Sequence, residues 1–449
     1  MAEYMKILFV SLGCDKNLVD TEMMLGMLTQ KGYELTDDEN EADVVIVNTC
    51  CFINDAKQES INTLLEMSEL RKNNEVKALI ACGCLAQRYK EEIQKEIPEV
   101  DAIIGTTAID AIVEVLEWVL DGKGQNCIED INRKPVYDKK RIVTTGGHYA
   151  YLKIAEGCDK HCSYCIIPKV RGSFRSIPME SLIKEAQTLV ESGVKELILV
   201  AQETTLYGMD LYGKKSLPKL LQKLCEIKGL YWVRILYCYP EEITDELIET
   251  IKKEDKICNY LDIPIQHGTD RILKRMGRRT NKQEIVSIVE KLRKEIPDIC
   301  LRTTLITGFP GETDEDHEEL MQFVNDMEFD RLGVFTYSPE EDTPAALFDD
   351  QLDEDIKTDR QAEIMELQQE IAFEKAEEMV GRTVLVMVEG AVPDEHVYVA
   401  RSYKDAPNVD GLVFIQTSEE LMTGDFVRVK ITGSYEYDLI GEIDNEFTK

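Results

Sequence analysis

Short apolar runs alternate with amphipathic stretches over about the first 120 residues of the chain. Apolar runs of strand-forming residues occur at 6–10, 43–48 and 76–82, and a helical pattern extends from about Asn17 to Gln30. A second helical pattern separates the two later runs. Strands that alternate with helices in this way form parallel sheets with helices on their faces. The pattern predicts an N-terminal parallel α/β domain.

The same alternation recurs at larger scale between about residues 150 and 335. Strands are predicted at 151–157, 196–202, 232–237, 260–266, 300–308 and 331–338, with amphipathic helices between them. This series of βα units favours a barrel or partial barrel over an open sheet. A long helix from about Leu352 to Met379 is expected to follow an acidic loop.

After residue 381 the pattern changes to short strands with Gly-containing turns. Five are predicted, at 383–390, 397–402, 411–416, 425–432 and 438–443. Such a set is typical of a small OB-like β-barrel. We therefore divide the chain into an N-terminal domain (1–121), a linker (122–147), a central domain with its trailing helix (148–380) and a terminal barrel (381–449).

Composition narrows the setting of the protein. The 449 residues are 43% apolar and 31% charged, as in a soluble globular chain. No apolar run is long enough to span a bilayer, and the opening MAEYMKILFV lacks the layout of a signal peptide. We expect a cytoplasmic protein with no membrane association. In the cytosol thiols stay reduced, so the thirteen cysteines point to metal or redox chemistry rather than disulfides.

Three of these cysteines, Cys158, Cys162 and Cys165, form a C-x3-C-x2-C pattern in one loop. Three thiolates at this spacing can bind three irons of a 4Fe-4S cluster and leave the fourth iron open for another ligand. A zinc site is the alternative, but such sites usually combine two pairs of ligands, and no second pair follows here. The spacing therefore predicts a 4Fe-4S cluster at this loop.

Cysteines also follow each of the first three predicted strands, as Cys14, Cys50 and Cys84. In a parallel sheet all three lie at the carboxyl edge, where open α/β folds place their ligands. Their convergence would form a second cluster site, although buried cysteines are often simply small core residues. The neighbours Cys51 and Cys82 leave the choice of ligands open on spacing alone.

The whole arrangement resembles the methylthiotransferase family of radical S-adenosylmethionine enzymes, over nearly the full chain. The segments that carry the resemblance are GCDKN (13–17), NTCCFINDAKQES (48–60), GCLAQRY (83–89), EGCDKHCSYCIIPKVRGSFRSIP (156–178) and IPIQHGTDRILKRMGRR (263–279). It implies that the central domain is a partial radical-SAM barrel and that the terminal domain is a TRAM barrel.

The resemblance also implies two 4Fe-4S clusters with separate tasks. The cluster at Cys158, Cys162 and Cys165 would bind S-adenosylmethionine and generate a carbon-centred radical, because no general base can remove a hydrogen from an unactivated carbon. In the family the second cluster is held by the cysteines that match Cys14, Cys50 and Cys84, which favours Cys50 over Cys51. That cluster would carry the sulfur, and the product would be a methylthioether.

Further contacts to S-adenosylmethionine are expected at the predicted strand ends, where barrel enzymes build their sites. The candidates are Tyr164, Gln202, Arg234, Gln266 and Gly308. Tyr164 would pack against the adenine, and Gly308 would allow close approach of the backbone to the cofactor. His267 fits a structural histidine better than an acid–base group. Glu312 belongs to an acidic cluster at a predicted helix start.

Charge bears on the substrate. The family modifies either a tRNA adenosine (the MiaB type) or an aspartate of small-subunit ribosomal protein S-twelve (the RimO type). The chain has a net charge of −34, and the terminal barrel has six Lys or Arg against thirteen Asp or Glu, a net charge of −7. Such a surface opposes RNA phosphates and attracts a basic protein.

ARSYKDAPNVDG (400–411) also resembles the terminal domain of the RimO type. We therefore predict an aspartate β-carbon of the basic ribosomal protein, free or within its subunit, as the substrate, and a monomeric enzyme. The MiaB type is the alternative. A non-enzymatic iron–sulfur module does not account for a complete cysteine loop within a full barrel. The sequence identifies neither the electron donor nor the sulfur donor.

Overall fold

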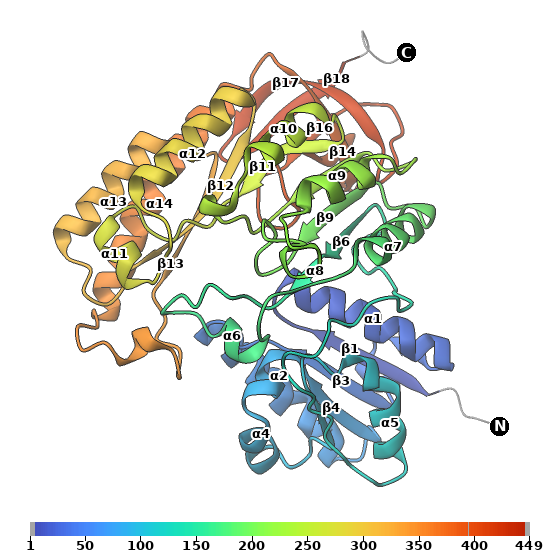
Figure 1. Cartoon of the computed structure of the whole chain (residues 1–449). Helices are drawn as coiled ribbons and strands as arrows, with labels where there is room; N and C mark the ends of the chain where they lie inside the picture. Colours follow the sequence, from blue (N-terminus) through green and yellow to red (C-terminus); the bar gives the residue numbers. More distant parts are fainter. Residues whose placement is uncertain (1–4, 394, 445–449) are drawn as a thin grey trace.

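The computed structural model describes residues 5–393 and 395–444, so the outer ends of the first and last predicted domains lie outside the described residues. The first domain contains a parallel sheet with strand order β2-β1-β3-β4-β5, of which β1, β3 and β4 are labelled in Figure 1. Its strands are β1 (Lys6–Ser11), β2 (Glu34–Thr36), β3 (Val44–Thr49), β4 (Ala78–Cys82) and β5 (Ala102–Ile104). The predicted parallel α/β domain is confirmed, and β2 and β5 are additional edge strands.

Helices cover both faces of this sheet. They are α1 (Asp15–Lys31), α2 (Asn54–Lys72), α3 (Gly83–Arg88), α4 (Lys90–Glu96) and α5 (Ile112–Leu120). Alternate residues of β3 point to opposite faces, so Ile46 packs with α1 and α5 while Val47 packs with α2 and α3. Gly32 caps the carboxyl end of helix α1, and its φ of 105° is the left-handed conformation that glycine adopts most easily.

The central domain is built on a second parallel sheet, with strand order β13-β12-β11-β10-β9-β6. Its strands are β6 (Tyr149–Lys153), β9 (Glu196–Val200), β10 (Trp232–Ile235), β11 (Ile257–Asp262), β12 (Cys300–Thr307) and β13 (Arg331–Thr336). Among the described residues β6 and β13 do not pair with each other, so the sheet is an open, partial barrel, as predicted.

The two faces of the central sheet have different neighbours. Leu152, Leu199 and Ile235 point to one face and join an apolar core with the helices that follow the strands. Those helices are α7 (Met179–Glu191), α9 (Leu217–Cys225), α10 (Asp245–Lys253), α12 (Lys282–Glu295) and α13 (Asp314–Met327). Tyr151 and Ile198 point to the opposite face, called the inner face below, which packs against α1 and the terminal barrel.

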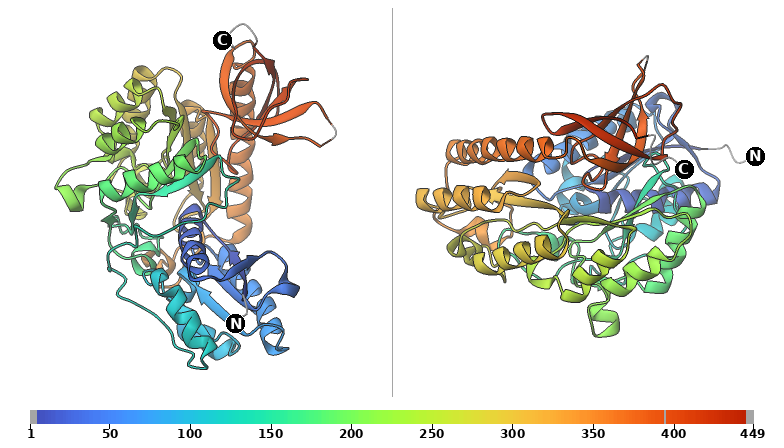
Figure 2. Two further views of the ribbon diagram at one scale, coloured as in Figure 1. Left: turned by 90° about the vertical axis from the view of Figure 1, so that its right-hand side faces the viewer. Right: turned by 90° about the horizontal axis from the view of Figure 1, so that it is seen from above.

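The terminal barrel is closed, with strand order β14-β15-β16-β18-β17. The strands are β14 (Thr383–Ala391), β15 (Val397–Ser402), β16 (Val413–Gln416), β17 (Phe426–Tyr435) and β18 (Asp438–Ile443). The predicted OB-like barrel is therefore confirmed. The predicted long helix is also present, as α14 (Glu354–Glu377), and leads from the central domain into the barrel (Figure 2).

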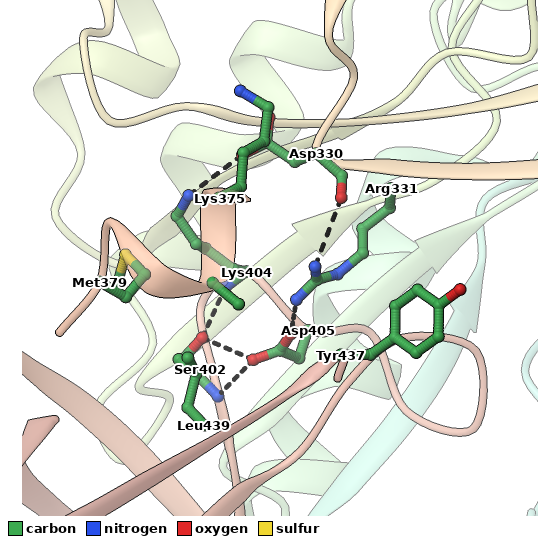
Figure 3. A pocket seen from close by; sticks show the side chains of 10 residues that line it. Asp330, Arg331, Lys375, Met379, Ser402, Lys404, Asp405, Tyr437 and Leu439 are labelled. Atoms are coloured by element: carbon green, nitrogen blue, oxygen red, sulfur yellow. Dashed lines mark hydrogen bonds and ion pairs between the residues drawn. The ribbon is translucent and has the colours of Figure 1, made fainter. Parts of the chain in front are cut away.

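Ion pairs join the barrel to the central domain where α14 and β13 meet it (Figure 3). Arg331 pairs with Asp405 at 2.7 Å, and Lys404 pairs with Asp330 at 3.1 Å. A cavity of about 20 Å³ lies between these groups. This volume is enough for one water molecule and far too small for S-adenosylmethionine. The contact is a docking surface between two domains.

Residues 121–148 contain no helix or strand, and this stretch lies wholly within the described residues. It crosses from α5 to β6 along α1, where Arg141 pairs with Glu22 of α1 at 2.5 Å and with Glu185 of α7 at 2.9 Å. The stretch therefore fastens the first domain to the central one. In the described part of the chain no helix is both long and apolar enough to cross a membrane.

Candidate functional site

Cys14, Cys50 and Cys84, the first-domain trio, lie together at the carboxyl edge of the first sheet. Cys14 precedes α1, Cys50 follows β3, and Cys84 lies in the first turn of α3 after β4. A Cβ atom at Gly13 would lie 2.8 Å from Sγ of Cys50, so the loop before α1 passes directly over that sulfur. Only glycine allows this approach, and its φ of 87° also suits glycine.

Asn17 holds the three loops of this trio together. Its amide donates to the carbonyl oxygens of Leu12 and Thr49, each at 3.0 Å, and Sγ of Cys84 lies 3.9 Å from its Oδ1 atom. Burial raises the pKa of the Cys50 thiol, and the neighbouring Cys14 raises it further. Cys50 and Cys84 are buried and Cys14 is exposed, so the site is open to solvent on the Cys14 side.

The neighbouring cysteines, Cys51 and Cys82, are both fully buried. Cys51 is fully buried in the apolar core on the α2 side of the sheet, and burial raises its pKa to about 11. Cys82 is buried in the core on the α1 side, where its thiol lies 3.5 Å from the carbonyl oxygen of Val47. Cys84 belongs to the same core as Cys51; burial raises the pKa of the Cys84 thiol, and both Cys51 and Cys50 raise it further. The choice of Cys50 over Cys51 as a ligand remains a prediction.

Cys158, Cys162 and Cys165, the loop trio, occupy the loop after β7 (Ala155–Glu156) and before α6 (Ile167–Val170). The amide of Cys158 donates to the carbonyl oxygen of Gly172 at 3.1 Å, and that of Cys165 donates to Cys162 at 3.0 Å. Burial raises the pKa of Cys158 to about 11, and Cys162 adds to this shift. The loop turns back on itself and brings the three thiols together.

A second segment, the IPIQHGTDRILKRMGRR motif (263–279), supports this loop. The amide of Ser163 donates to the carbonyl oxygen of Met276, and its hydroxyl donates to that of Arg275, each at 2.8 Å. Arg278 is buried, with its Nη1 atom 3.9 Å from Sγ of Cys162 and its guanidinium stacked over the ring of Tyr239. We did not predict Arg278 individually, although the RMGRR run within a recognised motif was the available signal.

The described residues include no group of three His, Cys, Asp or Glu side chains arranged around a single metal ion. Zinc gathers all its ligands around one point, whereas each thiolate of a 4Fe-4S cluster binds a different iron. A cluster at either trio remains a prediction.

Glu203 lies beside the loop trio and is fully buried. Its Oε1 atom accepts hydrogen bonds from the amide and hydroxyl of Thr205, whereas no described residue donates to its Oε2 atom. Burial raises the pKa of Glu203 to about 8, because the ion is poorly solvated. A buried carboxylate oxygen without a donor suits a positively charged amino group, such as that of S-adenosylmethionine.

Three segments of the chain match known families. Residues 6–105 match uncharacterized protein family UPF0004, residues 152–324 match the radical SAM superfamily, and residues 380–443 match the TRAM domain. The ribosomal protein uS12 methylthiotransferase RimO of Lachnoclostridium phytofermentans is 63% identical over 97% of this chain and 99% of that protein. The chain belongs to the RimO family of radical SAM methylthiotransferases. The RimO protein of Clostridioides difficile is 49% identical over 98% of this chain and 99% of its own length.

Solved structures resemble the fold at low sequence identity. The radical S-adenosylmethionine methyltransferase TsrM from Kitasatospora setae has a TM-score of 0.56 at 12% identity, covering 77% of this chain and 74% of that one. The cobalamin-dependent radical enzyme OxsB has a TM-score of 0.51 at 13% identity, covering 81% of this chain and 56% of that one. At such identities the likeness concerns the fold alone.

Three other residues singled out from the sequence lie near the carboxyl ends of the central strands. Gln202 accepts from the amide of Gly157 at 2.8 Å and so holds the start of the cysteine loop. Tyr164 packs edge to face against Phe309, with ring centroids 6.4 Å apart. Gln266 has a φ of 77° and joins β12 through hydrogen bonds of its backbone. The side chain of Gln202 is therefore already engaged in holding the cysteine loop.

Arg234 does not lie at this end of the RimO-family fold. Its guanidinium is fully buried on the inner face, where it pairs with Glu196 at 2.8 Å and donates to the carbonyl oxygen of Tyr403 at 2.6 Å. The expected cofactor contact is therefore wrong for Arg234, which joins the central sheet to the terminal barrel. In sequence, a charged residue within a strand looks the same in either role.

A Cβ atom at Gly308 would clash with the side chain of Lys357 on α14, which is one reason for glycine at this position. The close approach of its backbone to a cofactor remains a prediction. His267 is a structural residue, as expected, because its Nδ1 atom accepts from the amide of Thr269 at 3.1 Å. Glu312 is more than a helix-start charge, because it pairs with the buried Arg360 at 2.9 Å.

Proposed function

We propose that this protein methylthiolates the β-carbon of an aspartate in ribosomal protein uS12 and uses two 4Fe-4S clusters to do so. The observation that carries the proposal is the pair of cysteine trios, each at the carboxyl edge of its own sheet. Helix α1 lies between them, because its Asn17 holds the loops of the first-domain trio and its Asp20 pairs with Arg171, which follows the loop trio. The RimO relatives are named for this activity, and the match with them covers almost their full length.

Each domain has a separate task in this proposal. Domain 1–121 holds the auxiliary cluster with the first-domain trio. The central domain, 148–380, holds the other cluster with the loop trio and binds S-adenosylmethionine, which supplies the methyl group and the radical that removes hydrogen from carbon. The linker, 122–147, ties the two together. The terminal barrel, 381–449, meets the substrate.

The chain's own residues would orient S-adenosylmethionine at the loop trio. The free Oε2 atom of Glu203 would accept a hydrogen bond from its amino group. Tyr164 and Gln266 remain proposed contacts, with the Tyr164 ring beside the adenine. Gln202 would act mainly through the backbone of Gly157. Burial of these groups excludes water from the reacting atoms.

Charge supports a protein substrate over tRNA. The net charge of −34 would repel RNA phosphates and would attract a basic ribosomal protein, free or within its subunit. We propose a cytoplasmic monomer with no membrane association, served by an electron donor and a sulfur donor that are not yet identified. A tRNA methylthiotransferase of the MiaB type would need a basic face for its substrate.

The test is an anaerobic assay with reconstituted enzyme, reductant, S-adenosylmethionine, sulfide and either uS12 or tRNA. We expect a mass gain of about 46 Da (CH₂S) on one aspartate of uS12, with 5′-deoxyadenosine as co-product. Replacing either trio by alanines should lower the iron content from about eight to about four atoms per chain and abolish product. Cys51→Ala is the matched control and should retain both. A mass gain on tRNA alone would refute the proposal.

A further inference from the structure

Arg171 lies between the two cysteine trios and is almost completely enclosed. It follows α6, the helix directly after the cysteine loop, and its side chain is 2% exposed. All three nitrogens of its guanidinium have partners. Nε donates to Sγ of Cys84 at 3.3 Å, Nη1 donates to Asp20 at 2.8 Å, and Nη2 donates to Asn17. A residue of the central domain thus reaches a sulfur of the first domain.

The surrounding charges are balanced without the sulfur. Lys153 pairs with Glu156 at 2.8 Å and also with Asp20, and Nη1 of Arg171 contacts Glu156 at 3.2 Å. Two buried cations therefore face two buried carboxylates. The Nε–H donor has Sγ of Cys84 as its partner. A charged donor at this sulfur would suit a thiolate that binds a metal cluster.

The same network continues to the loop trio. Glu156 accepts from Nε2 of Gln202 at 3.2 Å, and Oε1 of Gln202 accepts from the amide of Gly157 at 2.8 Å. Gly157 directly precedes Cys158. A continuous path of hydrogen bonds therefore runs from the sulfur of Cys84 through Arg171 to the backbone of the loop trio.

We propose that Arg171 is a positioning residue that raises the reduction potential of the auxiliary cluster by donating a hydrogen bond to the sulfur of Cys84. The inference rests on the proposed function, because it requires a cluster at the first-domain trio. A donor and a positive charge at a ligand sulfur stabilise the reduced cluster, which carries one more negative charge than the oxidised one. Loss of Arg171 should therefore make reduction of this cluster harder.

The test is a redox titration followed by electron paramagnetic resonance, in the full chain with Cys158, Cys162 and Cys165 replaced by alanine so that only the auxiliary cluster contributes. In this background Arg171→Gln removes the charge and the Nε–H donor, and we expect the midpoint to become more negative by at least 59 mV, a tenfold change in a one-electron equilibrium. Arg171→Lys keeps the charge but not the planar fork, so a smaller shift in the same direction is expected.

The matched control is Arg141→Gln in the same background. Arg141 has a buried side chain that also pairs with a carboxylate of α1, Glu22, and its second partner is Glu185 of α7 rather than a cysteine. It should leave the midpoint unchanged, although it loosens the same domain contact.

The outcomes separate the two proposals. If the background protein binds no cluster, the auxiliary site itself fails, and the proposed function fails with it. If the cluster is present but its midpoint stays within the error of the parent in both Arg171 variants, the inference about Arg171 is overturned while the proposed function stands. If Arg171→Gln does not fold, Arg171→Lys still allows this second outcome to be tested. A shift equal to that of Arg141→Gln would also overturn it.

Discussion

The two ends of strand β9 carry buried glutamates in opposite circumstances. Glu196, at the amino end, pairs with Arg234 at 2.8 Å and with Arg401 of the terminal barrel at 2.7 Å. Glu203, three residues beyond the carboxyl end, has a carboxylate oxygen with no donor among the described residues. Both side chains are fully inaccessible to solvent. Glu196, which pairs with two arginines, is called the matched carboxylate below. Glu203, which has one oxygen without a donor, is called the unmatched one.

The matched glutamate, Glu196, helps to join two domains, whereas the unmatched one, Glu203, is a candidate for ligand binding. Burial alone would raise the pKa of Glu196, but the guanidiniums of Arg401 and Arg234 outweigh it and lower that pKa. For Glu203 burial prevails and raises the pKa to about 8. A fold tolerates a buried, unmatched carboxylate at a cost in stability, and such groups concentrate at sites that bind ligands. The unmatched end is also the end with the loop trio.

The largest expected effect comes from Glu196→Gln at the matched end. It would leave Arg234 and Arg401 buried without their shared carboxylate, and breaking such a pair costs about 3–5 kcal/mol. Both arginines belong to the contact with the terminal barrel, so the barrel should detach at lower temperature than in the parent. Thermal unfolding combined with limited proteolysis near residue 381 measures this. Unchanged proteolysis would mean that the ion pairs do not hold the domains together.

Glu203→Gln should have the reverse effect on the protein without cofactor. Removing a poorly solvated charge should raise the thermal unfolding midpoint at pH 8 by a few degrees. Affinity for S-adenosylmethionine should fall by about 10- to 100-fold, because a hydrogen bond to a charged group is worth about 1.5–3 kcal/mol. Calorimetric titration of S-adenosylmethionine into reconstituted enzyme gives the affinity. Equal affinities would remove Glu203 from the binding site.

The two glutamates should also give opposite pH profiles. The lowered pKa of Glu196 means that its contribution to stability is present above the ordinary value of 4.5 and is lost as the pH falls through the folded-state pKa. The raised pKa of Glu203 means that the folded protein loses stability as the pH rises from 4.5 to about 8. The gain from Glu203→Gln should therefore be large at pH 8 and absent at pH 5. A gain that is independent of pH would contradict the assigned pKa.

The same residues show which features of the fold and the site could be predicted from the amino-acid sequence and which could not. Hydrophobic alternation was sufficient for both parallel sheets and the terminal barrel, because each strand carries that pattern locally. Cysteine spacing located the loop trio within one loop, and its role as a cluster site remains a prediction. Arg234 was misassigned because its partners are distant in sequence: Arg401 shares Glu196 with it from another domain. Glu203, next to Gln202 in the sequence, was not predicted. A carboxylate oxygen that lacks a donor can be recognised only when its neighbours in space are known.

The smallest expected effect comes from Tyr260→Phe, at the contact between the central sheet and the terminal barrel. Tyr260, on the inner face, donates its hydroxyl to Asp410 of the terminal barrel at 2.7 Å. Asp410 also accepts from the amide of Ala406 at 2.9 Å and pairs with Arg302 at 3.3 Å, so it keeps partners if the hydroxyl is removed. Tyr260→Phe should therefore destabilise barrel docking by only about 1 kcal/mol.

The proteolysis assay used for Glu196→Gln can resolve this difference if Lys291→Ala serves as the control. Lys291 forms an exposed pair with Asp245 away from the barrel contact, and pairs of this kind contribute little. We expect the order of barrel release to be Glu196→Gln, then Tyr260→Phe, then Lys291→Ala together with the parent. If Tyr260→Phe released the barrel as readily as Glu196→Gln, docking would depend on the whole polar network and not chiefly on the matched carboxylate.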